Sequence, residues 1–344
     1  MNRLMRAVMA MCVAMFVVPA ALAQDVTLTG AGASFPYPFY SKLFSEYNKA
    51  HPGVKINYSS VGSGTGIKQI SDRSIDFGAS DAPMTDAQLK AAQGGELLHI
   101  PMTLGAVVPI YNVPGVNKPL VFSGAVLADI FRGKITVWND PAITALNPGV
   151  KLPDAGITVV HRSDGSGTTY IYTEYLSKVS GDFAKAPGKG TTVNWPVEDK
   201  VGAKGNEGVS GVVSKTPGTI GYVELIFALQ NKIAFGDVQN AAGKTVHATM
   251  EGVTAAAASM TNPPADLRMS ITNAPGDAAY PISAFTYLLV YKDQADASKG
   301  KALVDFLKWA VADGQRYAPD LHYAPLPENI VNADQAKVDG IVVK

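Results

Sequence analysis

Two kinds of apolar segment alternate along the chain. Runs rich in β-branched residues are typical of buried strands, and apolar residues that recur every three or four positions are typical of helices. We expect strands at 26–28, 54–58, 75–81, 97–111, 157–160, 220–224 and 282–291. We expect helices from Pro38 to about residue 50, then at 67–70, after Thr85, at 126–131, a short one starting at 138–141, and at 170–179, 255–258 and 302–311. Residues 237–279 carry the weakest pattern.

This alternation, with short turns between the elements, predicts an α/β fold with largely parallel sheets. In such sheets ligands bind beyond the carboxyl ends of the strands, where the following helices begin. Four turns that carry glycine or a small polar residue fall at this edge, near Ser34, Ser63, Asp81 and residues 162–168. A cleft between two lobes would bring the first three turns and the distant fourth onto one ligand.

The turn at 162–168 reads RSDGSGT and lies between an expected strand and an expected helix. Unpaired N–H groups at a helix start suit an anion, hydroxyls such as Ser166 and Thr168 add donors, and Arg162 adds a planar fork for two oxygens. The same residue types also serve as ordinary helix caps and turns. Repetition of the pattern elsewhere in the chain favours an anion site.

The first 23 residues have the pattern of a secretory signal peptide. Arg3 and Arg6 precede an apolar run, and small residues then predict cleavage before Gln24. The chain has 344 residues with 29 basic and 29 acidic side chains, so loss of the two arginines leaves a net charge of −2. This balance argues against a nucleic-acid partner. Because Cys12 is the only cysteine, the mature chain has no disulfide framework and no cysteine nucleophile.

Nucleotide-binding and catalytic motifs do not fit the chain. Phe35 occupies the place of the third glycine of a dinucleotide fingerprint, and the glycines before Lys68 do not have P-loop spacing. A secreted phosphatase would need a nucleophile and usually metals. The five histidines are scattered, and no serine lies in a G-x-S-x-G elbow. We therefore expect no enzyme, no cofactor and no metal site, with phosphatase as the alternative.

Several motifs resemble the periplasmic phosphate-binding proteins of phosphate ABC transporters, over nearly the whole mature chain. They are GAGASFP at 30–36, GSG at 62–64, DFGASDAP at 76–83, RSDGSGT at 162–168, GKI at 133–135 followed by Trp138, and IGYVE at 220–224. The resemblance implies a two-lobed periplasmic-binding-protein fold of type II, with a ligand cleft between lobes joined by hinge strands. It places one lobe at 24–111 plus 283–344 and the other at 112–282.

The resemblance also implies the residues that bind phosphate and their roles. Asp164 would steady the charged contact Arg162, and Asp81 would face the ligand. The other expected contacts are hydroxyl or backbone donors: Ser34, Phe35, Ser63, Ser166, Gly167 and Thr168. Ser34 stands where the family often has threonine, and Ser63-Gly64-Thr65 stands where some members have Ser-Ser-Gly. The expected partners are inorganic phosphate and the permease and ATPase of an ABC importer, with the protein periplasmic and monomeric.

The chemistry of Asp81 distinguishes phosphate from sulfate. A carboxylate repels a bound anion unless the anion keeps a proton that the carboxylate can accept, and near neutral pH phosphate keeps one while sulfate does not. We therefore expect Asp81 to reject sulfate, with a helix-capping role as the alternative. Another tetrahedral oxyanion remains an alternative ligand, because arsenate has the same shape and protonation as phosphate.

Overall fold

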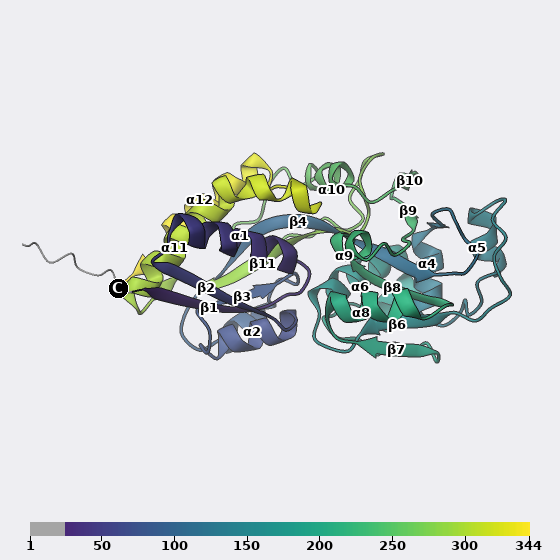
Figure 1. Ribbon diagram of the computed structural model, residues 1–344, viewed down its shortest axis with the longest axis horizontal. Coiled ribbons are helices and arrows are strands. Elements are labelled where there is room, and N and C mark those ends of the chain that lie inside the picture. The colour runs from purple at the N-terminus through teal and green to yellow at the C-terminus, as the bar shows by residue number, and fades with distance from the viewer. Residues whose placement is uncertain (1–24) are drawn as a thin grey trace, which may run out of the picture.

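The structure is a computed structural model that describes residues 25–344 (Figure 1). The predicted signal peptide, with Cys12, lies outside the described residues. Two lobes lie side by side along the long axis in Figure 1, one carrying β1–β3 and the other β6–β8. None of the helices that the structure describes is both long and apolar enough to cross a membrane.

One large sheet runs through both lobes. Its strand order is β2-β1-β3-β11-β4-β8-β6-β7. The strands are β1 Val26–Gly32, β2 Val54–Ser60, β3 Phe77–Ser80, β4 Leu97–Asn112, β6 Thr158–Arg162, β7 Lys200–Ala203, β8 Thr219–Glu224 and β11 Ser283–Tyr291. The pairs β1–β2, β1–β3, β6–β7 and β6–β8 are parallel, as the sequence pattern predicts.

Strand β4 connects the two halves of this sheet. Its first part, Leu97–Ala106, pairs antiparallel with β11, and its second part, Val107–Asn112, pairs antiparallel with β8. All of its residues except the last are buried, because sheet neighbours and helices cover it throughout. The expected strand at 97–111 is confirmed. Its antiparallel pairing with two distant strands is not visible in the local pattern.

Helices cover both faces of the sheet, with smaller elements at its margins. The helices are α1 Tyr37–Ala50, α2 Ser63–Ser71, α3 Asp86–Ala91, α4 Gly124–Phe131, α5 Pro141–Leu146, α6 Gly167–Val179, α7 Gly181–Lys185, α8 Gly205–Lys215, α9 Leu225–Gln230, α10 Met250–Ala257, α11 Ala297–Val311 and α12 Glu328–Asp339, with 3-10 turns η1 Asp313–Tyr317 and η2 Pro319–Leu321. The short strands are β5 Val121–Phe122, β9 Asp237–Gln239, β10 Thr245–Val246, β12 Asp293–Gln294 and β13 Val342–Val343.

The local signals in the sequence explain where most helices begin. Pro38 lies in the first turn of α1, and the predicted apolar face of this helix is buried. Ser123 caps α4 with its hydroxyl, and Thr85 caps α3 in a reciprocal capping box with Gln88. Residues 237–279 contain β9, β10 and α10, so the least regular part of the pattern contains short elements separated by coil.

Helix α2 begins earlier than the pattern predicts. The glycines of residues 62–66 suggest a turn followed by a helix from Ile67, but the helix starts at Ser63. The reason is close packing. A Cβ at Gly66 would lie 2.6 Å from the Ala79 carbonyl oxygen, so this glycine lets the first turn of α2 rest directly on the sheet. The predicted strand at 75–81 is also shorter, as β3 Phe77–Ser80.

Candidate functional site

The predicted site residues lie at the carboxyl ends of strands in both lobes. Ser34 follows β1, Ser63 follows β2, Asp81 follows β3, and Arg162 ends β6 immediately before the turn into α6. The whole group is buried at 5% exposure or less: Ser34, Phe35, Ser63, Asp81, Arg162, Ser166 and Thr168. The structure therefore brings together the four turns that the strand–helix pattern placed at one edge. We call this group the anion cluster.

Ser63 joins the two sides of the anion cluster. Its hydroxyl oxygen accepts the backbone N–H of Gly167 at 3.0 Å and that of Asp81 at 3.3 Å. Beside it, the Gly64 N–H donates to the Gly165 carbonyl at 2.9 Å. Ser63 begins α2 and Gly167 begins α6, and these helices lie in different lobes in Figure 1, so the contacts show a closed arrangement.

The turn before α6 supplies both the cap and the donors. The Ser166 oxygen accepts the Thr169 N–H at 3.0 Å, so the helix-cap interpretation of Ser166 is correct. The remaining N–H groups of the first turn have no partner within the helix. Gly167 must lack a side chain here, because a Cβ would lie 2.4 Å from Asp81 Oδ2 and 2.5 Å from Ser63 Oγ.

Arg162 and Asp164 form a bidentate ion pair at this turn. Arg162 Nε donates to Asp164 Oδ1 at 2.7 Å and Nη2 donates to Oδ2 at 2.5 Å. Within residues 25–344, no protein acceptor lies within hydrogen-bond reach of the Arg162 Nη1 group. Burial raises the pKa of Asp164, but the hydrogen bond and charge of Arg162 outweigh burial and leave that pKa below its ordinary value. The pair thus keeps a charged donor buried without a large net charge.

Asp81 is a buried carboxyl group, and one of its oxygens accepts a hydrogen bond from the protein. The Thr286 hydroxyl donates to Oδ1 at 2.7 Å, and Oδ2 lies against Gly167. Burial raises the pKa of Asp81 from 3.8 to about 7, although Thr286, the charge of Arg162 and Ser63 each lower it. The capping alternative for Asp81 is wrong, because Thr85 caps the next helix.

Phe35 fixes the loop after β1 by a hydrogen bond and by ring packing. Its carbonyl accepts the Tyr323 hydroxyl at 2.6 Å, and its ring packs against Gly105 of β4, where a Cβ would lie 2.7 Å from the ring. Among residues 25–344, the Phe35 N–H has no protein acceptor. This arrangement leaves the N–H beside Ser34 able to donate to a ligand.

Three further residues belong to the cluster and were missed from the sequence. Asn206 donates to Ser34 and to Thr168, Thr286 donates to Asp81, and the buried Glu224 gives its backbone N–H to Asn206. Asn206 follows β7 in a glycine-containing turn, Gly205-Asn206-Glu207-Gly208, that opens α8. That turn has the same strand–glycine–helix pattern as the other four, so the sequence could have indicated Asn206 as a site residue. Thr286 lies within β11, where nothing in the local sequence marks it. Glu224 ends β8 and belongs to the IGYVE motif, but that motif gave no indication of a contact with the site.

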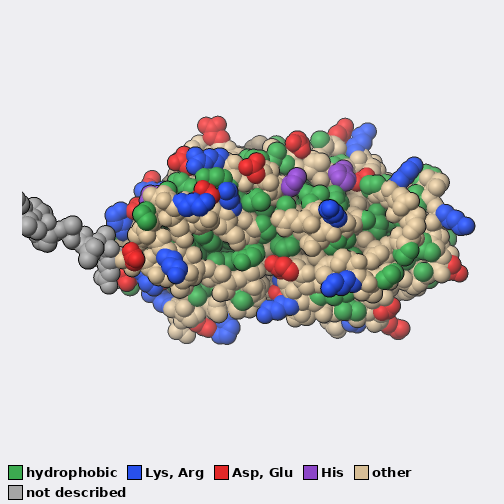
Figure 2. Space-filling view, in the orientation of Figure 1, with side chains coloured by type: hydrophobic (Ala, Val, Ile, Leu, Met, Phe, Trp, Pro, Cys, Tyr) green, Lys and Arg blue, Asp and Glu red, His purple; other side chains and the backbone are tan. Residues whose placement is uncertain are grey.

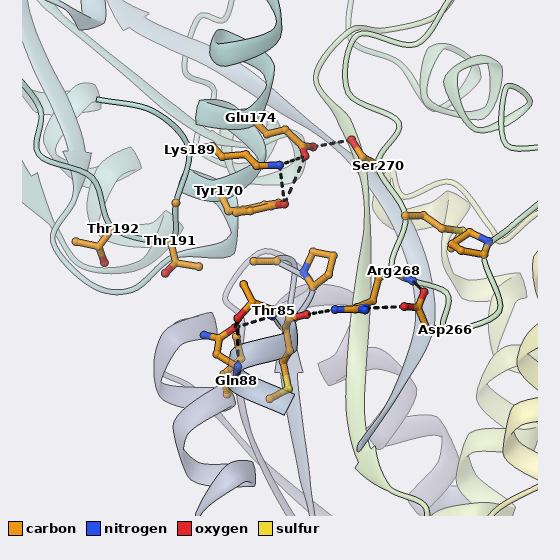
Figure 3. Close-up of a pocket in the computed structure, with 17 residues that line it drawn as sticks. Thr85, Gln88, Tyr170, Glu174, Lys189, Thr191, Thr192, Asp266, Arg268 and Ser270 are labelled. Carbon is orange, nitrogen blue, oxygen red and sulfur yellow. Dashed lines mark hydrogen bonds and ion pairs between the residues drawn. The ribbon is translucent and has the colours of Figure 1, made fainter. Parts of the chain in front are cut away.

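A cavity of about 790 Å³ opens beside the anion cluster without including it. Figure 3 shows Tyr170, Glu174 and Lys189 on one wall, Thr85 and Gln88 on the opposite wall, and Arg268 with Asp266 to the side of Thr85. Its charges are already paired: Lys189 with Glu174 at 3.1 Å, and Arg268 with Asp266 at 2.8 Å and with Asp86 at 2.7 Å. None of the predicted site residues lines this cavity.

Metal ligands are not assembled in the described part of the chain. Among residues 25–344, no group of three or more His, Cys, Asp or Glu side chains is placed to hold a metal ion. Buried His99 accepts the Met84 N–H at 2.9 Å, and burial lowers its pKa to about 4. This histidine is therefore neutral, and its hydrogen bond holds the loop that follows Asp81.

Comparison with known proteins identifies the family. A family model described as a PBP superfamily domain matches residues 18–313. The chain is 48% identical to the phosphate-binding protein PstS of Xylella fastidiosa (strain 9a5c), over 91% of this chain and 85% of that protein. It is 41% identical to the phosphate-binding protein PstS of Methanocaldococcus jannaschii, over 89% of this chain and 84% of that protein.

Solved structures share the fold at lower identity. A high-affinity periplasmic phosphate-binding protein bound with phosphate matches with a TM-score of 0.75 and 21% identity, over 90% of this chain and 93% of that chain. A phosphate-binding protein from Stenotrophomonas maltophilia matches with a TM-score of 0.73 and 20% identity, over 91% and 94%. The predicted fold class is thereby confirmed. On the strength of the sequence matches, the chain belongs to the PstS family of phosphate-binding proteins, within the PBP superfamily.

Proposed function

We propose that this protein captures inorganic phosphate within the anion cluster and delivers it to an ABC-type importer. The relatives at 41–48% identity carry the name phosphate-binding protein, which supports phosphate as the ligand. The chemistry of the cluster supports the same ligand. The cluster directs hydroxyl and N–H donors and one guanidinium group toward the proposed ligand position. It also places there one carboxyl group that can accept a proton from the ligand.

One contact carries the proposal more than any other. The 3.0 Å hydrogen bond from the Gly167 N–H to Ser63 Oγ joins the N-terminus of α6 to that of α2. Both termini present N–H groups and the positive end of a helix dipole to the same buried point, which is where an anion is stabilised. We propose that phosphate contacts Ser34, Phe35, Ser63, Asp81, Arg162, Ser166 and Thr168, with Asp164 holding Arg162. Gly167, the remaining expected contact, gives its N–H to Ser63 Oγ and lies against the anion without donating to it.

We propose that closure and release come from rotation of two lobes, at 24–111 plus 283–344 and at 112–282. Strand β4 supports a division into two lobes, because its pairing changes from β11 to β8 between Ala106 and Val107, a little before the proposed boundary at 111. A ligand shifts such an equilibrium only if it binds the closed state more tightly. Donors from both lobes meet phosphate together only in the closed state, which gives that difference in affinity.

We propose that the protein binds phosphate without hydrolysing phosphoesters. The principal experiment is calorimetry of the mature protein, stripped of ligand, against phosphate and sulfate. We expect tight phosphate binding, with sulfate increasingly rejected above about pH 7 as Asp81 ionises, and absence of phosphate binding would overturn the proposal. Incubation with a chromogenic phosphomonoester tests the alternative, since turnover would indicate a secreted phosphatase.

We propose a periplasmic, monomeric protein whose partner is the membrane permease and ATPase of a phosphate importer. Charged side chains of both signs are interspersed over the face in Figure 2, without a continuous basic field on that face. This distribution, together with the mature net charge of −2, supports a small-anion ligand rather than nucleic acid. Size-exclusion chromatography with light scattering tests the monomer, and a second copy bound at micromolar concentration would contradict it.

A further inference from the structure

We propose that Asn206 is a positioning residue that commits two hydroxyl groups of the cluster to donate to the bound anion. This inference rests on the proposed function, because it concerns how the same site selects its ligand. Asn206 is fully buried in the first turn of α8 and contacts both Ser34 and Thr168. Its role is therefore carried out through these two hydroxyls.

The orientation of the Asn206 amide is fixed by a backbone group. The Glu224 N–H, at the end of β8, can only donate, and it lies 2.9 Å from Asn206 Oδ1. Oδ1 must therefore face Glu224, and the Nδ2 group must face the cluster. Nδ2 donates to Ser34 Oγ at 2.9 Å and to Thr168 Oγ1 at 3.1 Å, which uses both of its protons.

Counting donors and acceptors shows what these contacts do to the hydroxyls. A serine or threonine hydroxyl has one proton to donate and two lone pairs to accept. Ser34 Oγ accepts from Nδ2 and, at 3.3 Å, from the backbone N–H of Asn206, so both lone pairs are occupied. Its proton is left to donate to a ligand. Thr168 Oγ1 accepts one bond from Nδ2 and is biased the same way.

The Ser63 hydroxyl is also oriented to donate to a ligand, but by backbone N–H groups rather than by a side-chain amide. Its oxygen accepts two backbone N–H groups, from Asp81 and Gly167, so its proton also remains for a ligand. The cluster then presents donors at Ser34, Ser63 and Thr168, with Asp81 Oδ2 as the acceptor. An anion that carries one proton, with its other oxygens free to accept hydrogen bonds, fits this arrangement. In an anion with more protons, an O–H group would face a hydroxyl group of the site that can only donate.

Closure and orientation are linked through Ser34. Ser34 follows β1 in one lobe, whereas Asn206 and Thr168 lie at the starts of α8 and α6 in the other (Figure 1). The bonds from Asn206 to Ser34 can form only when these elements meet. Opening the cleft would free the Ser34 hydroxyl to rotate, so the site becomes selective as it closes.

The test uses two substitutions that affect the donors differently. Asn206→Asp keeps the shape and the acceptor for Glu224, but an ionised carboxylate cannot donate, so Ser34 and Thr168 turn their protons toward it. Phosphate affinity should fall about 10- to 100-fold, the range for lost hydrogen bonds to a charged ligand. The loss relative to wild type should shrink as the pH falls, because the introduced carboxyl group regains a donor when it is protonated. Asn206→Ala should lose affinity without that pH dependence.

A double-mutant cycle separates positioning from a general structural effect. If Asn206 acts through Ser34, then Asn206→Ala should cost much less affinity in a Ser34→Ala background than in wild type. Asn240→Asp is the matched control, because Asn240 is a buried asparagine that also bonds backbone groups on both sides of its amide. We expect this variant to change thermal stability and leave phosphate affinity unchanged.

Calorimetry with inorganic phosphate on folded variants decides the outcome. Wild-type protein that binds no phosphate would remove the proposed function itself. Wild-type binding with additive Asn206 and Ser34 effects, or with an Asn206→Asp loss that is independent of pH, would overturn the positioning role alone. Should Asn206→Asp not fold, the Asn206→Ala cycle gives the same decision.

Discussion

Asp81→Asn removes the charge from the carboxyl group that lies against the start of α6 and preserves its shape. Oδ1 accepts the Thr286 hydroxyl, and an asparagine oxygen can keep that bond. The asparagine nitrogen then stands where Oδ2 stood, facing Gly167. The position that accepts a ligand proton in the wild type becomes a donor in the variant. We expect the variant to bind sulfate, which offers only acceptors.

The pKa of Asp81 sets the size of this effect. Burial raises that pKa from 3.8 to about 7, which corresponds to about 4 kcal/mol opposing ionisation in the closed site. Below about pH 7 the carboxyl group is mostly protonated and does not repel sulfate. Above it the group is mostly ionised, so wild-type sulfate affinity should fall about tenfold for each further pH unit. At about pH 9, Asp81→Asn should bind sulfate about 100-fold more tightly than wild type.

The assay is calorimetry of ligand-stripped protein with phosphate and with sulfate at about pH 6, 7.5 and 9, at constant ionic strength. Asp86→Asn is the matched control, since it removes the same charge from the same lobe at an exposed position paired with Arg268. This control should leave the ratio of phosphate to sulfate affinity unchanged at every pH. A wild-type sulfate affinity that does not vary with pH, or a folded Asp81→Asn that still rejects sulfate at about pH 9, would show that the charge of Asp81 does not exclude sulfate.

Three other substitutions test separate parts of the site. Arg162→Ala removes the charged donor and leaves the part-buried Asp164 without its ion-pair partner. At about 2–5 kcal/mol for such a loss, phosphate affinity should fall about 30-fold or more by calorimetry; a two- or threefold change would place the guanidinium outside the site. Gly167→Ala puts a Cβ against Asp81 Oδ2, so closure should cost about 1–3 kcal/mol more. Small-angle scattering with saturating phosphate should then show a more open shape than wild type, and an identical shape would argue against close packing at this point. Burial raises the pKa of Glu224 well above 4.5, so the folded state holds a proton that the unfolded state releases, and this group alone should lower the free energy of unfolding by about 1.4 kcal/mol per pH unit between 4.5 and its folded pKa. Glu224→Gln should flatten that slope in denaturant titrations, and an unchanged slope would show that Glu224 is ionised in the folded protein.

Local patterns predicted most strands and helices because each depends on its own residues. The β-branched run at 157–160 forms β6, and the hydroxyl residues Ser123 and Thr85 cap their helices as their positions indicate. The edge of the sheet where ligands bind was also predictable, since parallel strands end together and their turns carry the polar residues. Four of the five turns that form the cluster were identified in this way.

The contacts that complete the site could not be predicted, because they join residues far apart in the chain. Asn206 and Ser34 are separated by 172 positions, and Thr286 and Asp81 by 205. Thr286 lies within the buried strand β11, whose local pattern gives no indication of a polar role. The change of partner along β4 could not be predicted for the same reason. Its first part pairs with β11 and its second part with β8, and both of these strands are distant in the chain.

A crystal structure of the mature protein with phosphate bound would show whether donors from both lobes meet on one anion. We predict one phosphate between the starts of α2 and α6, with its oxygens in contact with Ser34, Ser63, Arg162 and Thr168 and with Asp81 Oδ2 within hydrogen-bond distance. A phosphate held elsewhere, or one that reaches the residues of a single lobe only, would contradict it.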